Sequence, residues 1–252
     1  MKKLFLKILF VSLLQAFLMS DAQISQLFRN KDRLDNLEAF DEQTYSWGFF
    51  LNMNNYDYKI VLNPKYGIYN NQNLVQSKPT YSFGAGLIGK MRLNEYFDLR
   101  VEPGLQFVDR ELTFNTQVNS SALVLTDADK IRRVKSTYVD VPVLLEFHVD
   151  RWYNSRPYVA GGLNYMMNLQ SNSSAADDNQ QGIFRTTTHN FGWSAEMGIQ
   201  FYFSRFKLTP GFRGTFFFNN ELVADNPGTP PYWAAAMNTI QTRAFMFVLK
   251  FE

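Results

Sequence analysis

The chain has 252 residues, with 25 basic against 23 acidic side chains, no cysteine and an aromatic content of 16%. This near-neutral balance gives no reason to expect a nucleic-acid partner, and the lack of cysteine excludes disulfides and lipid attachment through an N-terminal cysteine. Beyond the first 22 residues, no segment approaches the roughly twenty consecutive apolar residues of a membrane helix, so any insertion into a membrane must use strands.

The N-terminus has the pattern of a secretory signal peptide. Three lysines precede an apolar run at residues 8–19, and Ser20, Asp21 and Ala22 follow as a small-x-small cleavage site. As a helix the run would span about 18 Å, which is too short to cross a hydrocarbon core. We predict a signal peptide over residues 1–22 and, after it, a periplasmic arm over residues 23–43.

Eight segments then alternate bulky apolar residues with small or polar ones, which is the period of a strand with two unlike faces. They cover residues 45–53, 81–87, 99–114, 138–149, 159–169, 191–203, 206–218 and 245–251. Short connections at residues 91–96, 150–156 and 204–205 alternate with long polar ones at residues 55–79, 115–135, 171–189 and 219–239. Short turns on one side and long loops on the other are typical of outer-membrane barrels.

The composition of the two faces separates a membrane barrel from a soluble sandwich. One row is bulky and aromatic, whereas the other consists of glycine, serine, alanine, asparagine and charges, and an eight-stranded barrel is only wide enough inside for side chains. We therefore predict an all-β, eight-stranded antiparallel up-and-down transmembrane β-barrel over residues 44–252. In the outer membrane, its order of connections places both termini in the periplasm and four long loops outside the cell.

The charged residues of the polar row are predicted to lie in the lumen. They are Arg100, Glu102, Arg110, Asp140, Glu146, Glu196 and Arg213. A conduction or proton path is one interpretation, and a buried ion-pair network that fills the bore is the other. We favour the network because eight strands leave no aqueous channel. Pro103, Pro142 and Pro210 each remove a ladder donor, so each predicts a bulge or a break in pairing.

We expect no catalytic, cofactor or metal site and no small-molecule substrate. His148 and His189 are the only histidines, and neither is accompanied by a serine elbow, a paired-histidine metal spacing or a phosphate loop. An outer-membrane enzyme nevertheless stays a third hypothesis, behind the two non-catalytic ones given below.

Two segments carry candidate contacts with partner proteins. In the arm these are Phe28, Leu37 and Phe40, although the arm is equally interpreted as a tail across the barrel mouth. In the last loop they are Tyr232 and Trp233, which are otherwise explained as part of the interfacial aromatic belt.

Four stretches resemble the PorT family in the matching order: residues 36–64, 93–114, 136–147 and 156–169, of which the third reads STYVDVPVLLEF. The resemblance implies an outer-membrane component of the type IX secretion system of Bacteroidetes. Such proteins are needed for export of proteins with a C-terminal sorting domain and, in gliding species, for motility. Other components of that system, still unidentified, are the implied partners, together with outer-membrane lipid. The alternative is a structural or adhesion barrel without an export role.

Overall fold

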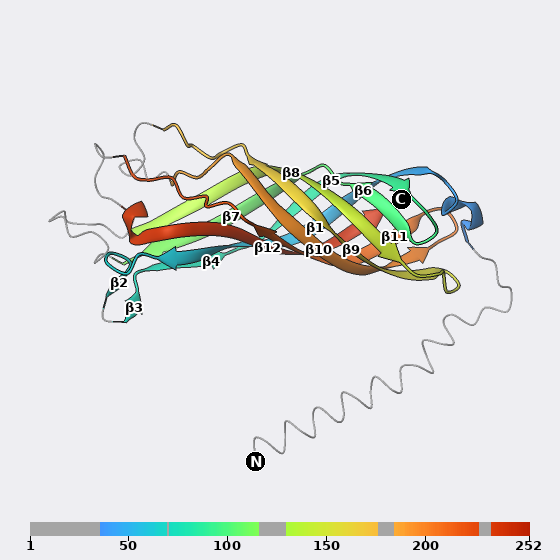
Figure 1. The fold of residues 1–252 in the computed structure, drawn as a ribbon, viewed down its shortest axis with the longest axis horizontal. Helices are drawn as coiled ribbons and strands as arrows, with labels where there is room; N and C mark the ends of the chain where they lie inside the picture. Colours follow the sequence, from blue (N-terminus) through green and yellow to red (C-terminus); the bar gives the residue numbers. More distant parts are fainter. Residues whose placement is uncertain (1–35, 70, 116–129, 176–183, 227–232) are drawn as a thin grey trace, which may run out of the picture. The chain divides into compact units, whose positions relative to one another are not determined.

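A closed ring of antiparallel strands forms the chain between Tyr45 and Phe251 (Figure 1). The computed structural model describes residues 36–69, 71–115, 130–175, 184–226 and 233–252. The predicted signal peptide, Phe28 and Tyr232 therefore lie outside the described residues. The elements, in order, are η1 (Glu38–Phe40), β1 (Tyr45–Leu62), β2 (Ile68–Tyr69), β3 (Gln72–Asn73), β4 (Val75–Pro79), β5 (Tyr81–Arg92), β6 (Phe97–Val101), β7 (Gly104–Phe114), β8 (Ile131–His148), β9 (Ser155–Asn168), β10 (His189–Tyr202), β11 (Lys207–Phe217), η3 (Ala234–Ala236) and β12 (Met237–Phe251).

The ring has eight strands, as predicted, because two of its strands are each built from two segments. β4 and β5 together form the second strand, and β6 and β7 together form the third. β1 pairs with β12 on one side and with β5 on the other, which closes the ring. Pairing between these last neighbours removes the open edges that a sheet would otherwise expose.

The three prolines of the sequence pattern coincide with gaps in the strand ladders, as predicted. Pro103 and Pro142 face the same gap, where β6 ends and β7 begins without a change of register against β8. There the amide of Glu102 donates to the carbonyl of Pro142 at 3.1 Å. Pro210 lies where the pairing of β10 with β11 is interrupted between Gly211 and Leu208.

The two ends of the barrel differ. We call the end with the short connections, next to Arg92, His148 and Tyr202, the turn end, and the opposite end the loop end (Figure 1). In the half near the turn end, outward residues are large, apolar and exposed, as at Trp47, whose exposed fraction is 76%. Inward residues at the same level are buried and many are polar, as at Glu102, whose exposed fraction is 0%.

Toward the loop end, both faces reverse their polarity. On β1 the outward row changes from Met53 to Asn55, Asp57 and Lys59, while the inward row changes to tyrosine. Asp57 accepts from Arg243 on β12 at 2.6 Å, so this part of the outer face carries ion pairs in place of aromatic rings. A polar exterior around an apolar interior is the arrangement of a water-soluble protein.

Four strands extend further toward the loop end than the sequence pattern indicated. The residues predicted as loops include the end of β1, the whole of β4, the start of β8 and the start of β12, so these loop boundaries were wrong. The extended parts surround a second apolar cluster, which we call the loop-end core. Its buried members are Tyr58, Leu74, Val75, Leu112, Phe114, Val134, Trp233, Ala236, Met237 and Ile240. Within the described ranges, no helix has the length and apolar character needed to cross a membrane.

Candidate functional site

Six charged side chains meet inside the half of the barrel that carries the apolar exterior. Three are cations and three are anions, so their formal charges cancel: Arg100, Arg213, Lys250, Glu102, Glu146 and Glu196. We call this set the lumen ion network. All six are 4% exposed or less, which is why each charge needs a partner.

Each cation of the lumen ion network bridges at least two carboxylates from different strands. Arg100 on β6 contacts Glu102 at 3.1 Å and Glu196 at 2.7 Å, and it also pairs with Glu146. Arg213 on β11 donates through Nε to Glu196 at 2.7 Å and also pairs with Glu102. Because these contacts run between β6, β8, β10 and β11, the network links opposite walls of the ring.

Small residues make room for the network. The hydroxyl of Tyr158 donates to Glu196 at 2.7 Å from inside the bore. A Cβ atom at Gly211 would lie 2.6 Å from that hydroxyl oxygen, and one at Gly198 would lie 2.8 Å from it. Both contacts are shorter than van der Waals contact, so a side chain at either glycine would displace Tyr158.

The structure brings five of the seven predicted lumen charges into this network. Asp140 and Arg110 are also buried inside the barrel, but neither forms an ion pair with another described residue. Arg110 instead donates to Thr242 at 3.0 Å and to Tyr138, and its guanidinium stacks on Tyr58 at 3.8 Å. Its level in the bore is that of the loop-end core, where aromatic faces replace carboxylates as partners.

Lys250 is a member that sequence reasoning missed. It contacts Glu102 at 3.2 Å and also pairs with Glu196. Its signal was present in the alternation of β12, which places Lys250 in the same inward row as Ala244, Met246 and Val248. A lysine one residue before the last aromatic of a strand also resembles a residue at the membrane surface. Alternation by itself therefore does not assign Lys250 to the lumen charges.

A second polar cluster fills the turn end of the bore. Lys90 and His148 contact Asp98 at 3.4 and 3.3 Å, and Lys207 pairs with Glu252. Burial by itself would raise the pKa of the Glu252 side chain, but Lys207 and then Lys90 outweigh it and lower that pKa to about 2.

The described end of the arm, residues 36–43, lies at the mouth of the turn end. The ring of Phe40 lies beneath two buried ammonium groups, with Lys207 Nζ 4.9 Å and Lys90 Nζ 5.8 Å from its centroid. Asp41 accepts from Arg156 at 3.0 Å and from the Tyr202 hydroxyl at 2.9 Å. The apolar face of Phe40 is therefore used within the chain.

Leu37 marks where the arm bends. Its φ of 54° is in the left-handed region that branched side chains rarely adopt, so this conformation needs support from its surroundings. Arg151 supplies that support, because its guanidinium donates to the carbonyl of Asn36 and, at 3.5 Å, to the carbonyl of Leu37. The same guanidinium stacks on Tyr202 at 3.8 Å, which ties the bend to β10.

Trp233 is not available to a partner, contrary to our expectation. Its exposed fraction is 1%, and its ring packs 5.1 Å from that of Phe114 within the loop-end core. The following helix η3 is held by Asp225, which accepts from the amide of Ala234 at 2.7 Å. The last loop thus folds its tryptophan down into the bore, where the inward row of the extended strands offers apolar neighbours.

Glu221 is the charged group next to this core. It accepts from the amide of Thr242 at 2.9 Å and is fully buried. Burial raises the pKa of the Glu221 carboxyl, and the positive charge of Arg110 only partly opposes this rise.

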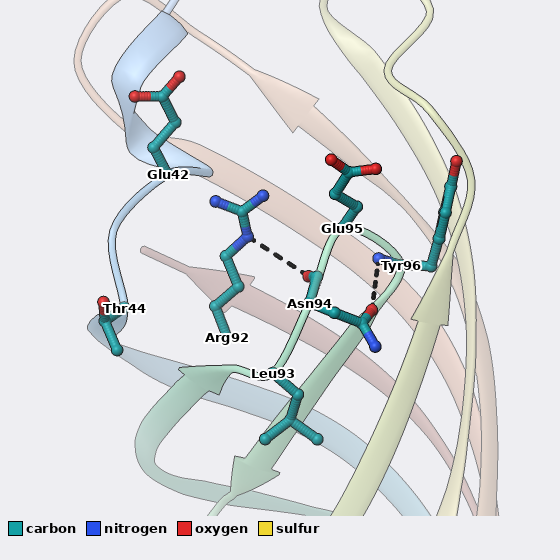
Figure 2. A pocket seen from close by; sticks show the side chains of 7 residues that line it. All are labelled: Glu42, Thr44, Arg92, Leu93, Asn94, Glu95 and Tyr96. Atoms are coloured by element: carbon teal, nitrogen blue, oxygen red, sulfur yellow. Dashed lines mark hydrogen bonds between the residues drawn. The ribbon is translucent and has the colours of Figure 1, made fainter.

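One depression lies at the rim of the turn end, with a cavity volume of about 580 Å³. Figure 2 shows its lining, which comes from the arm and from the turn between β5 and β6: Glu42, Thr44, Arg92, Leu93, Asn94, Glu95 and Tyr96. The turn is fixed by Asn94, whose Oδ1 accepts from the amide of Tyr96 at 2.8 Å. No group of three or more metal-binding side chains stands together in the part of the chain that the structure describes.

The ring of eight strands, its aromatic exterior and its ion-paired lumen define the class of protein, which is an outer-membrane β-barrel. The chain belongs to the family described as outer membrane protein beta-barrel domain, which it matches over residues 24–223. No curated protein sequence matches it.

Solved structures of outer-membrane proteins are similar to this chain at low sequence identity. Neisserial surface protein A has 8% identity and a TM-score of 0.41, with 82% of this chain and 98% of that chain covered. OprG from Pseudomonas aeruginosa has 12% identity and a TM-score of 0.42, covering 81% and 93%. AlkL has 13% identity and a TM-score of 0.43, covering 88% and 92%.

Proposed function

We propose that this barrel is a non-catalytic, accessory component of the type IX secretion system, which acts by binding other components of that machine. The proposal implies that the barrel does not conduct its cargo. The single observation that supports this is the lumen ion network, because it joins opposite walls and occupies the cross-section of the bore. Exported proteins then cross the membrane through another component, and this chain contributes surfaces that bind other components. The assignment to type IX secretion rests on the PorT resemblance of its four sequence stretches.

In this proposal the turn end faces the periplasm and the loop end faces the outside of the cell. The order of short and long connections supports that orientation, since outer-membrane barrels have short periplasmic turns. The depression at Arg92 and the arm then face the periplasm, where charged groups such as Glu42 and Glu95 can meet a periplasmic component. Where gliding occurs, the same role supports motility.

The test is deletion of the gene in its native bacterium. We expect proteins with a C-terminal sorting domain to accumulate in the periplasm and to be depleted outside the cell, with recovery on complementation. Envelope integrity is measured in parallel by sensitivity to detergent and to large antibiotics. Unchanged export would contradict the proposal.

A structural or adhesion barrel without an export role is the second candidate. The extended wall at the loop end favours it, because strands with their own apolar core form a rigid surface beyond the aromatic exterior. It predicts an envelope or attachment defect in the deletion strain while export stays normal.

A further inference from the structure

The outermost part of the loop end carries exposed apolar side chains well away from the aromatic exterior. Val61, Tyr66 and Ile68 are 45%, 46% and 40% exposed. Val61 lies at the end of β1, Tyr66 in the turn that follows and Ile68 at the start of β2, which Figure 1 draws at the end of the barrel opposite the C-terminus. We call these three residues the tip patch.

Lipid does not account for the tip patch. The last apolar outward residue of the exterior on β1 is Met53, and Val61 follows eight positions later, about 26 Å along the strand. Between them the outward row is polar, and Asp57 pairs with Arg243 at 2.6 Å. An apolar cluster beyond a hydrated, ion-paired surface is typical of a protein-binding site.

The backbone beneath the tip patch is held in place. Asn63 donates to the carbonyl of Ala236 at 2.9 Å, and Gly67 donates to the carbonyl of Asn63 at 2.7 Å. A Cβ atom at Gly67 would lie 2.2 Å from the Ala236 oxygen, so only glycine allows the turn to pack this closely on η3. A surface fixed in this way loses little conformational entropy when a partner binds.

Two exposed lysines flank the tip patch. Lys59 and Lys65 are exposed, and Lys65 lies 5.0 Å from the centroid of the Tyr66 ring. Residues 58–94 contain no aspartate or glutamate. The described carboxylates on this part of the barrel are engaged within the chain. Asp57 on β1 and Glu111 on β7 face arginines, at 2.6 and 3.8 Å, and Asp225 accepts from the amide of Ala234 at 2.7 Å.

We propose that the tip patch is a docking site for an acidic loop of another protein at the cell surface, in which an apolar side chain is flanked by carboxylates. Val61, Tyr66 and Ile68 supply the apolar contact, and Lys59 and Lys65 supply the complementary charge. Three apolar residues make a small interface, which is typical of a transient contact. The inference rests on the orientation given under the proposed function.

The experiment places a photoreactive phenylalanine analogue at position 66 of the full chain in living cells of the native bacterium. Position 113, which is exposed on the outer face of β7, is the matched control position. We expect a discrete protein adduct at position 66 alone, whose cross-linked peptide contains aspartate or glutamate. The double variant Lys59→Glu/Lys65→Glu is expected to reduce that adduct at least tenfold, whereas Lys59→Arg/Lys65→Arg should retain it.

Charge exchange completes the test. Changing the acidic residues of the captured peptide to lysine should restore the adduct with the Lys59→Glu/Lys65→Glu variant. Heat-modifiable mobility on denaturing gels shows in each case that the barrel is folded. No adduct, a glycolipid adduct, a second copy of this chain, or an adduct that ignores charge reversal overturns the inference.

Failure of this inference and failure of the proposed function are distinguishable. If the adduct depends on charge but deletion of the gene for this chain leaves export normal, the docking site is retained and the secretion role is rejected. An export defect without such an adduct rejects the docking site alone.

Discussion

Arg100 illustrates how a single buried charge is held in this barrel. Its guanidinium contacts Glu102, Glu146 and Glu196, and its side chain is 3% exposed. Water does not reach these carboxylates, so protein cations must replace it. The loss of Arg100 would leave three anions with only Arg213 and Lys250 as partners.

We therefore predict that Arg100→Met destabilises the folded barrel by about 3 to 5 kcal/mol, the usual effect of removing one partner from a buried charge pair. The measurement is urea unfolding in lipid vesicles. Arg133→Met is the matched control, because its side chain is 69% exposed and 3.8 Å from Glu111. An exposed pair of this kind contributes about 0 to 1 kcal/mol. Equal stability losses for the two variants would refute the importance of the network.

The pair of Lys207 and Glu252 predicts a pH dependence. The pKa of Glu252 is lowered to about 2 in the folded barrel, below its ordinary value of 4.5. A lowered carboxyl pKa stabilises the folded state above the unfolded pKa, and this contribution is lost as the pH falls from about 4.5 to 2. Glu252→Gln should be less stable at pH 7, and its difference from the wild type should vanish near pH 2. Unfolding curves at several pH values check this, and a constant difference would contradict it.

At the scale of single elements, β7 shows how one strand serves two environments. Its outward residues begin with Leu105 and Phe107 and continue with Asp109, Glu111 and Thr113. Its inward residues change in the opposite sense, from Gln106 to Leu112 and Phe114. A strand with this pattern crosses from lipid to water between Phe107 and Asp109.

This reversal predicts unequal effects of one substitution at two outward positions of β7. Leu105→Arg places a charge among acyl chains, between the midplane and the interface, and should cost about 1 to 3 kcal/mol. Thr113→Arg adds the same charge beyond the lipid and should change the free energy of unfolding by less than about 0.5 kcal/mol. Unfolding in vesicles compares both with the wild type. Similar losses at the two positions would mean that lipid covers the whole strand.

The same reversal explains which parts of the fold could be predicted from the sequence. The eight strands were predictable, because alternation of large apolar and small polar residues persists wherever one face meets lipid. The extensions to Leu62, Val75, Ile131 and Met237 were not predictable. At these strand ends the large residues are inward and the outward row resembles a polar loop. The alternation of apolar and polar residues does not by itself indicate which face of a strand meets water.

The part of the candidate site that consists of charged residues could be predicted from the sequence. Five of the predicted lumen charges meet because opposite charges stabilise one another where water is excluded. The positions of Trp233 and Phe40 depended on how a loop and an arm fold back onto the barrel. Such contacts between distant segments leave no periodic signal, so aromatic residues that fill the bore resembled residues that bind a partner.

At the scale of the whole molecule, three sets of side chains fill the bore at successive levels along its axis. Phe40 and its lysines lie at the turn end, the lumen ion network lies within the aromatic exterior, and the loop-end core with Trp233 lies beyond it. The three are built from different side chains and use different interactions. A substitution in one therefore leaves the contacts of the other two in place.

This arrangement predicts that the purified barrel does not conduct ions after reconstitution into planar bilayers. Trp233→Ala and Phe40→Ala should stay equally closed, because each alters one end and leaves the six charges of the lumen ion network in contact. A conducting porin inserted into the same bilayers shows that channel activity would be detected, and heat-modifiable mobility shows that each variant is folded. Stable conductance steps from the wild type would contradict the filled bore. Steps from Trp233→Ala alone would place the seal in the loop-end core, because the ion network would then be permeable on its own.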